Sequence, residues 1–539
     1  MTDSKGYISE VPHSKFGDTL EEQEEQLRSN PLLQSFLSSR KKHANDPVRP
    51  RYHYCNPEGR LNDPNGLCFW QNRWHMFYQT FPPEDPRPHW GHVVSDDLIH
   101  WRDLPHALYP NPEDGCWSGA SLVEEDRVLA HYYGHPRGNM TAISRDPLLL
   151  NWEKLGEIIP VPEVWAGYRI YDPCIWKKDG FYYSLSGGRL PSGPGGRARP
   201  ANFLFRSSDL KRWEYLHPFV EDDLFSENGD DGACPYFWPI GNKHMLLFFS
   251  HMRGGRYIIG DYDKGRDKLI ATDYGRFNFG AALPGGVHAP SAVPDGEGGL
   301  IVIFNVNWAL PSTGWSDEHR ASFFFGCWAG QQIMSLPRRL NLTNENELTI
   351  TPAGDIESLR GDNVQLVDRE IPSNQEMILS EIAGSSFEIK VEIDTQDSPM
   401  VALDVLRAPD KQEYTRIAFY RNRGLKPVLP GMGSSTPADG VGVHSLISID
   451  SSCSSILLEA RSRPPETAPV FLKPDEFLKL RVFVDRSIVE VFVNDKQCIA
   501  VRVYPGREDS TGVSILSQGQ GSRIISLDAW QMKSIYDRP

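Results

Sequence analysis

The fragment SDDLIHW at residues 95–101 decides the fold, because it returns twice in variant form further along the chain. The variants are SRDPLLLNW at 144–152 and SSDLKRW at 207–213. Each joins a serine, an aspartate two residues later, a turn and a tryptophan, and each precedes a new strand-like run. Units that recur at intervals of about 50 to 60 residues indicate a toroidal repeat. The sequence therefore predicts a β-propeller, with four strands in each blade.

The segments on either side of this repeat have different residue patterns. Residues 17–43 are rich in Glu, Gln and Leu and predict one or two amphipathic helices. The repeat character fades after 335–342, and 354–363 is typical of a short helical connector. Beyond it, the apolar residues of SFEIKVEID (386–394) and KLRVFVDRSIVEVFVND (479–495) alternate strictly. Such alternation predicts strands with one buried face, as in a β-sandwich.

Composition narrows the classes of function. A chain of 539 residues is long enough for two or more domains. The net charge of -15 argues against a polyanion such as nucleic acid and favours a neutral substrate. We expect no membrane partner, because no run of about 18 apolar residues occurs. The sixteen histidines show no metal-binding spacing, so no metal or organic cofactor is expected.

Two features predict a cytoplasmic location. The first thirty residues contain no apolar stretch that could act as a signal peptide. The eight cysteines are scattered and form no C-x-x-C pair, which is typical of buried free thiols in a reducing compartment.

The stretch RLNDPNGL at 60–67 places turn formers between two apolar segments. An aromatic strand follows at 74–79, and it ends in Gln79, a residue that burial alone would not select. A tight structural loop would explain the turn formers. The stretch also fits a turn that presents the Asp63 carboxylate beside an aromatic wall.

Several motifs together resemble glycoside hydrolase family 32, the invertase, inulinase and fructan hydrolase group. RLNDPNGL is similar to the family's W-M-N-D-P-N-G, with Leu61 where Met is usual. The other similar segments are HWGHVVSDDLIHW (89–101), GCWSGAS (115–121), WAGQQIMSLPRRL (328–340) and LRVFVDRSIVEVFVND (480–495). The resemblance implies an all-β chain, a five-bladed β-propeller followed by a C-terminal β-sandwich. The expected parts are a helical extension at 1–48, the propeller at 49–345, a linker at 346–362 and the sandwich at 363–539.

The resemblance also implies a chemistry, the retaining hydrolysis of fructofuranosides. In that mechanism one carboxylate attacks the anomeric carbon, and a carboxylic acid about 5–5.5 Å away protonates the leaving oxygen. By motif, Asp63 falls on the nucleophile and Asp172 on a third carboxylate that steadies the transition state. Further positions fall on residues that bind or wall the sugar, namely Asn62, Gln79, Trp90, Trp117, Ser118 and His288.

Two family positions do not match. The third carboxylate normally follows an arginine, but here Tyr171 precedes Asp172. The acid/base normally sits in E-C-P, but here the triplet begins with Ala233, which cannot transfer a proton. Three explanations of the missing acid are open. The acid was removed by engineering, the chain is a natural sugar-binding relative without turnover, or the site is natural and has been rebuilt. We favour the rebuilt site.

The reason is geometric, since side chains two apart on a strand share a face. Asp231 lies two residues before Ala233, and Arg169 lies two residues before Tyr171. We therefore predict that Asp231 supplies the proton and that Arg169, Tyr171 and Ala233 line the substrate. Two strand residues span about 6.6 Å, so a bulge or a shifted substrate is needed to bring Asp231 into line. Weaker candidates in the same acidic turn are Asp230 and Glu227.

The sequence thus predicts a glycosidase for sucrose, short fructooligosaccharides or a related furanoside, with a small carbohydrate as its partner. A fructosyltransferase that uses the same intermediate and a non-catalytic binding protein remain open. The glycine-rich stretch 186–200 is predicted to be a loop near the pocket rim. The identity of the proton donor, the linkage preference and the oligomeric state stay undetermined at this point.

Overall fold

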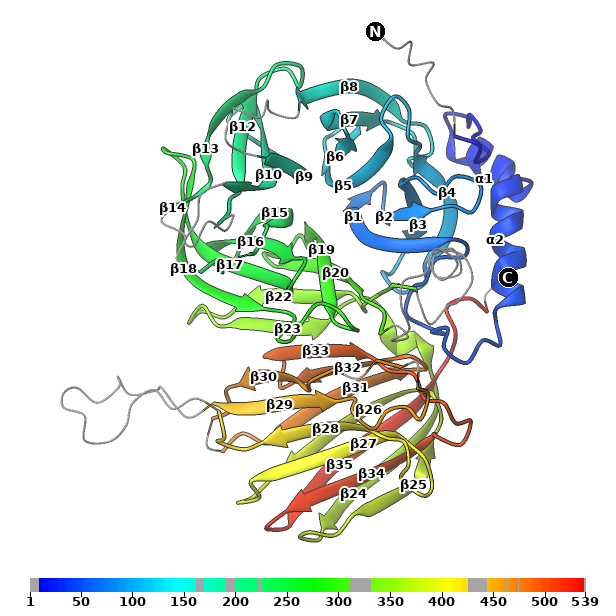
Figure 1. Ribbon diagram of the computed structural model, residues 1–539, viewed down its shortest axis with the longest axis vertical. Coiled ribbons are helices and arrows are strands. Elements are labelled where there is room, and N and C mark those ends of the chain that lie inside the picture. The colour runs from blue at the N-terminus through cyan, green and yellow to red at the C-terminus, as the bar shows by residue number, and fades with distance from the viewer. Residues whose placement is uncertain are drawn as a thin grey trace, which may run out of the picture.

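The computed structural model describes residues 9–160, 169–190, 199–221, 225–227, 229–309, 331–424, 444–458, 460–461, 463–473 and 475–537. Figure 1 shows one group of sheets arranged around a centre and a second, layered group of sheets beside it, with two helices packed at the edge of the first group. In the described part of the chain, no helix is long and apolar enough to cross a membrane.

The helical segment predicted over 17–43 is confirmed and consists of two helices, α1 (Leu20–Arg28) and α2 (Pro31–Lys42). Thr19 and Glu22 form a capping box at the start of α1, and Asn30 caps α2 ahead of a proline at its first position. The helices pack on the outer strands of the first sheets. Arg40 of α2 forms a two-pronged ion pair with Asp103, at 2.5 and 2.7 Å.

Within the described residues, 60–352 form five sheets, which are antiparallel except for the β14–β18 pair. The first has the order β1-β2-β3-β4 and contains β1 Arg60–Trp70, β2 Arg73–Phe81, β3 His89–Ser95 and β4 Arg102–Leu108. The second has the order β5-β6-β7-β8 and contains β5 Gly115–Val123, β6 Val128–His135, β7 Gly138–Ser144 and β8 Glu153–Pro160. The third contains β9 Arg169–Lys178, β10 Phe181–Leu190, β11 Arg199–Pro200, β12 Phe203–Ser207 and β13 Glu214–Pro218.

The last two sheets of this part follow the same plan. The fourth contains β14 Val220–Glu221, β15 Ala233–Ile240, β16 Lys243–Ser250, β17 Gly254–Asp263 and β18 Lys268–Arg276, with β14 parallel to β18. The fifth contains β19 Val287–Pro294, β20 Leu300–Val306, β21 Ile333–Met334, β22 Arg338–Leu342 and β23 Leu348–Pro352. The strand β23, inside the segment expected as a linker, pairs with β22.

The recurring serine–aspartate–tryptophan unit occupies the same place in three successive sheets. It connects β3 to β4, β7 to β8 and β12 to β13. In each copy the aspartate carboxylate accepts backbone N–H groups of the following turn, as Asp97 does from Ile99 at 2.9 Å and from His100 at 2.8 Å. Each turn also contains a leucine with a positive φ, which directly follows the aspartate at Leu98 and Leu210 and stands three residues after it at Leu149. The repeat in the sequence is therefore the chemistry of one recurring turn.

The first strands of the sheets contact one another in the order β1, β5, β9, β15, β19 and back to β1. This closed ring fits the predicted β-propeller, and Figure 1 shows the sheets radiating from it. The count of five blades stays a prediction, because residues 310–330, between β20 and β21, lie outside the described part of the chain.

The C-terminal part consists of two six-stranded sheets, as the alternating pattern predicted. One has the order β24-β35-β26-β31-β32-β33, formed by β24 Arg360–Ile371, β26 Ser386–Asp394, β31 Leu478–Asp485, β32 Ile488–Val493, β33 Gln497–Arg502 and β35 Ser522–Met532. The other has the order β25-β34-β27-β28-β29-β30, formed by β25 Met377–Ala383, β27 Met400–Arg407, β28 Thr415–Tyr420, β29 Ser445–Asp450, β30 Glu466–Val470 and β34 Gly512–Gln518. Aliphatic side chains of both sheets form one shared core. The predicted connector is the short 3-10 helix Ile356–Leu359.

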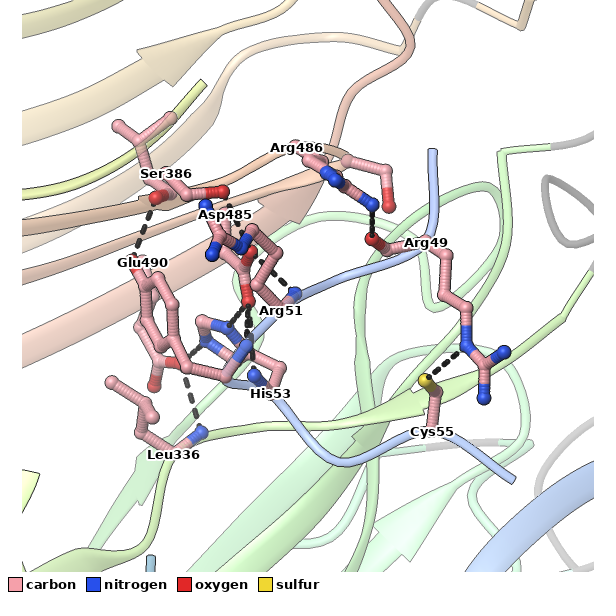
Figure 2. Close-up of polar contacts among 12 residues, drawn as sticks. Arg49, Arg51, His53, Cys55, Leu336, Ser386, Asp485, Arg486 and Glu490 are labelled. Atoms are coloured by element: carbon pink, nitrogen blue, oxygen red, sulfur yellow. Dashed lines mark hydrogen bonds and ion pairs between the residues drawn. The ribbon is translucent and has the colours of Figure 1, made fainter. Parts of the chain in front are cut away.

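A buried polar cluster joins the two parts (Figure 2). The carboxylate of Asp485, at the end of β31, accepts the backbone N–H groups of Arg51, Tyr52 and His53 at 2.7 to 2.9 Å. The His53 imidazole lies between Asp485, at 3.0 Å, and Glu490, at 3.4 Å. Arg338 of β22 pairs with Glu490 at 2.8 Å, and both side chains are fully buried. The segment that leads into β1 is thus fixed by the sandwich.

Each first strand loses register with its neighbour near its N-terminal end. These irregularities fall between Leu61 and Pro64 in β1, Cys116 and Gly119 in β5, Tyr171 and Pro173 in β9, Ala233 and Tyr236 in β15, and Val287 and Pro290 in β19. A β-bulge re-aims the side chain that it carries. The five bulges therefore turn one or two residues of each strand away from its regular faces, all at the same end of the ring.

Candidate active site

The Asp63 carboxylate lies at one of these bulges and is almost completely buried. Its Oδ2 atom accepts the Ser118 hydroxyl at 2.8 Å, and its Oδ1 atom accepts the Asn305 amide at 3.2 Å. The His288 Nδ1 atom is 3.6 Å from Oδ1. Burial alone raises the pKa of Asp63, but contact with His288 and the Ser118 hydrogen bond outweigh it and lower the pKa. Asp63 is thus an ionised carboxylate that accepts hydrogen bonds from Ser118 of β5 and Asn305 of β20 and lies beside the His288 imidazole of β19.

A chain of amide and hydroxyl groups orients this carboxylate. Asn62 donates to the Gln79 side-chain oxygen at 2.8 Å, and Gln79 donates to the Ser118 hydroxyl at 2.5 Å. The Ser118 hydroxyl in turn donates a hydrogen bond to the Asp63 carboxylate. The structure therefore brings together four of the residues that the sequence singled out. Gln79 is buried, and its amide is the central link of this hydrogen-bond network.

Asp172 is the second carboxyl group of the site. Its backbone has a φ of 47°, and Cys234 has a φ of 46°, so two non-glycine residues hold the left-handed conformation side by side. The Cys234 thiol lies 3.8 Å from an oxygen of Asp63 and 3.8 Å from an oxygen of Asp172. Burial, followed by the negative charge of Asp63, raises the pKa of Asp172 to about 8. At neutral pH, the site therefore pairs one ionised carboxylate with one protonated carboxyl group.

Asp231 lies just before β15, and it is a paired carboxylate. It accepts the Arg189 guanidinium at 2.8 Å and the His251 Nδ1 atom at 2.5 Å. Burial opposes its ionisation, but His251 and Arg189 outweigh burial and lower the pKa of Asp231. A carboxyl group with a lowered pKa holds no proton to donate at neutral pH. The geometry thus gives Asp231 no proton of its own, and its role in catalysis stays a prediction.

Tyr171 and Ala233 occupy one small apolar cluster together with Cys234, Phe249 and Ala289. The Tyr171 ring packs there, and its hydroxyl donates to the backbone oxygen of Asp231 at 2.7 Å. Ala233 is fully buried. The two departures from the family pattern are therefore neighbours in space, and a large ring packs where the shorter side chain leaves room.

We expect Ala233→Glu to destabilise the protein by about 1–3 kcal/mol, the usual effect of overpacking a filled core. It should not raise turnover, because the added carboxylate meets Tyr171 and Phe249 instead of open space. Urea denaturation and sugar release measure the two effects, with Ala281→Glu at an exposed position as the control. Faster turnover in Ala233→Glu than in the parent chain would contradict this account of the cluster.

The remaining predicted residues are placed as follows. Trp117 is half-buried beside Ser118, whereas Trp90 is fully buried and its indole N–H donates to the Trp117 backbone oxygen at 2.8 Å. Trp90 thus supports the backbone of Trp117 and does not itself face the site. Arg169 begins β9, but its side chain lies outside the described residues. Its partner in the ladder, Arg189, is the arginine that meets Asp231.

The two weaker acid candidates have other partners. Asp230 is fully buried and forms ion pairs with Arg253, at 2.7 Å, and with Arg256. Glu227 pairs with Arg253 at 3.0 Å and also with Arg276. The loop predicted over 186–200 is in part regular structure, because residues 186–190 complete β10 and 199–200 form β11, while 191–198 lie outside the described residues.

Sequence reasoning missed three side chains of this site, namely Asn305, Arg189 and His251. Asn305 follows an apolar run and looks like the end of a strand. His251 lies outside every recognised motif, and only the strand register of the structure places it in the site. The register of the β15–β16 hairpin pairs Ala233 with Phe249, and extending it by two residues places Asp231 opposite His251.

Among the described residues, no group of three or more His, Cys, Asp or Glu side chains could hold a metal ion. The site offers an ionised carboxylate, a protonated carboxyl group and hydrogen-bond donors. These are the groups that glycoside bond cleavage uses.

Comparison with known proteins agrees with this assignment. The model of the glycosyl hydrolases family 32 N-terminal domain matches residues 53–352, and that of the family's C-terminal part matches residues 355–531. The chain therefore belongs to glycosyl hydrolase family 32, a family of glycosidases.

Two bacterial relatives are similar over nearly their whole length. Sucrose-6-phosphate hydrolase of Escherichia coli is 29% identical over 87% of this chain and 94% of its own. Raffinose invertase of Escherichia coli is 27% identical over 92% of this chain and 97% of its own. Among solved structures, fructan 1-exohydrolase IIa from Cichorium intybus aligns with a TM-score of 0.75 at 22% identity, covering 91% of this chain and 98% of that one. The last comparison supports the fold.

Proposed function

We propose that this chain is a retaining glycoside hydrolase for small β-fructofuranosides, such as sucrose or short fructooligosaccharides. The observation that carries the proposal is the ionised Asp63, which accepts hydrogen bonds from β5 and β20, lies beside the His288 imidazole, and stands next to the protonated Asp172. A buried carboxylate with fixed donors is oriented for attack on an anomeric carbon. The names of the relatives support sucrose and related sugars as substrates.

In the first step, Asp63 attacks the anomeric carbon, the glycosidic bond breaks, and a fructosyl ester forms on the carboxylate. In the second step, water attacks the same carbon and releases Asp63. Asp172 lies across the Cys234 thiol from Asp63, where it can hydrogen-bond the sugar hydroxyls and strengthen those bonds as positive charge develops on the ring. Each step inverts the anomeric carbon, so the product retains the β configuration.

Methanol trapping tests this function directly. We expect the protein to release sugar from sucrose, from short fructooligosaccharides and from an aryl β-fructofuranoside. In the presence of methanol, part of the product should be methyl β-fructofuranoside, whose configuration is stable and readable by NMR. The methyl α-fructofuranoside would contradict a covalent intermediate, and release of no sugar from any of these substrates would contradict the proposed function.

We also propose a cytoplasmic location. Six of the described cysteines are unpaired and buried, and buried thiols fit a reducing compartment. In that location, small transported sugars are more accessible substrates than polymers.

A further inference from the structure

We propose that His251 is the general acid and base of the reaction, with Asp231 and Arg189 as positioning residues. The inference rests on the proposed function, and it supplies the proton that Ala233 cannot donate. A donor must be held in one orientation, must lie near both carboxyl groups of the site, and must be reachable by the leaving oxygen. His251 meets these three conditions.

The orientation comes from Asp231. The His251 Nδ1 atom lies 2.5 Å from the Asp231 carboxylate, and the His251 backbone N–H donates to the same carboxylate at 3.3 Å. Arg189 holds the other side of Asp231 at 2.8 Å. A carboxylate on Nδ1 fixes the tautomer, so the imidazolium carries its transferable proton on Nε2.

The position comes from the β15–β16 hairpin. Phe249 of β16 pairs with Ala233, and His251 follows two residues later, just beyond the strand. Its ring lies 4.8 Å from the Phe249 ring and 5.8 Å from the His288 ring, between centroids. His288 in turn lies 3.6 Å from Asp63. The imidazole therefore stands next to the position where the family carries its acid and is separated from the nucleophile by the ring of His288.

The His251 ring is accessible, and carboxylates surround it. The side chain of His251 is 62% exposed, whereas that of Asp231 is 2% exposed, so the ring is open to a substrate while its anchor is not. Burial of part of the ring lowers the pKa of His251, but the hydrogen bond and charge of Asp231 outweigh this and raise it. The ionisable groups around the ring are Asp231, Arg189, Asp63, Asp172 and His288. The surroundings of the ring thus favour its imidazolium form.

The proton balance follows from this placement. As Asp63 attacks, the bond from the anomeric carbon to the leaving oxygen breaks, and the Nε2 proton of His251 moves to that oxygen. His251 is then neutral. In the second step it takes a proton from the attacking water, whose oxygen bonds to the anomeric carbon while the ester bond to Asp63 breaks. The imidazolium and the free carboxylate are both restored.

The test compares leaving groups. His251→Asn should lower kcat/KM for sucrose and for short fructooligosaccharides by about 10²–10⁴-fold, the usual contribution of a general acid. An aryl β-fructofuranoside with an acidic phenol needs no protonation, so its first step should change by less than about tenfold. The control is His244→Asn. His244 lies at the far end of β16, roughly 20 Å from His251, and its ring stacks on Phe237.

Two further readouts separate catalysis from structure. Sodium azide should accelerate turnover of the aryl substrate in His251→Asn and give the β-fructosyl azide, because azide attacks without losing a proton. Asp231→Asn should lower the pKa of His251 and shift the alkaline limb of the kcat/KM profile to lower pH. Equal losses on sugar and aryl substrates in His251→Asn would overturn the assignment. So would a leaving-group dependence that appears in Asp172→Asn instead, since Asp172 also holds a proton at neutral pH.

The outcomes also distinguish this inference from the proposed function. If the parent chain cleaves the aryl and the natural fructosides but His251→Asn leaves both rates unchanged, His251 is not the donor and the function stands. If the parent chain cleaves no fructoside, the proposed function itself fails.

Discussion

Replacing Asp63 by asparagine is expected to lower kcat on sucrose and on aryl β-fructofuranosides by about 10⁴-fold or more, the scale at which loss of a catalytic nucleophile is felt. Asparagine has the same shape, and its oxygen still accepts a hydrogen bond from Ser118 or Asn305, so the fold should persist. Turnover of both substrates, with circular dichroism as the check on folding, measures the effect. Asp126→Asn, at an exposed position between β5 and β6, is the control.

The role of Asp63 can also be tested by the configuration of the product. With Asp63→Ala, sodium azide should enter from the face that the carboxylate has left and convert an aryl β-fructofuranoside into the α-fructosyl azide. The same reagent gives the β product when the carboxylate is intact and only His251 is changed. Activity of Asp63→Asn above about one per cent of the parent would show that another group is the nucleophile.

Asp485→Ala is expected to have the largest effect on stability, a loss of about 3–5 kcal/mol in the free energy of unfolding. The substitution leaves the backbone N–H groups of Arg51, Tyr52 and His53 buried without their acceptor. It also removes one of the two carboxylates that flank His53. Urea denaturation at pH 7 measures the loss, with Asp475→Ala at an exposed turn as the control.

This loss should depend on pH in a defined direction. Burial raises the pKa of Asp485, but His53 and the backbone N–H groups outweigh burial and lower it. A carboxylate with a lowered pKa stabilises the fold above its unfolded pKa of about 4, and this contribution disappears as the pH falls through the folded value. The difference between the parent and Asp485→Ala should therefore shrink below about pH 4. A loss below 1 kcal/mol at pH 7 would mean that water replaces the carboxylate at this interface.

The sequence predicted the parts of the fold that local chemistry determines. The Ser-x-Asp-turn-Trp units could be recognised because each aspartate closes its own turn, and 386–394 could be recognised as a strand because one of its faces is buried. The grouping of Asp63, Gln79 and Ser118 followed from family motifs and agrees with their hydrogen bonds.

The rest of the site depends on geometry that residue patterns do not carry. The bulges at Asp63, Asp172 and Cys234 leave no mark in the composition of their strands. His251 stands in a turn outside every recognised motif, and it reaches the site only because the β15–β16 register brings it opposite Asp231. Arg189 meets Asp231 through the pairing of β10 with β9, which a sequence does not specify residue by residue.

The anchoring of residues 51–55 by residues more than 430 positions later has a consequence for synthesis on the ribosome. Asp485 binds the backbone of 51–53, and the Tyr536 hydroxyl binds the backbone of His53 and Cys55 at 3.0 and 2.8 Å. The strand that bears Asp63 is synthesised long before Asp485 and Tyr536, yet its lead-in gains these contacts only after both residues have left the ribosome. A nascent chain should thus stay inactive until the segment that contains Asp485 and Tyr536 has emerged and folded.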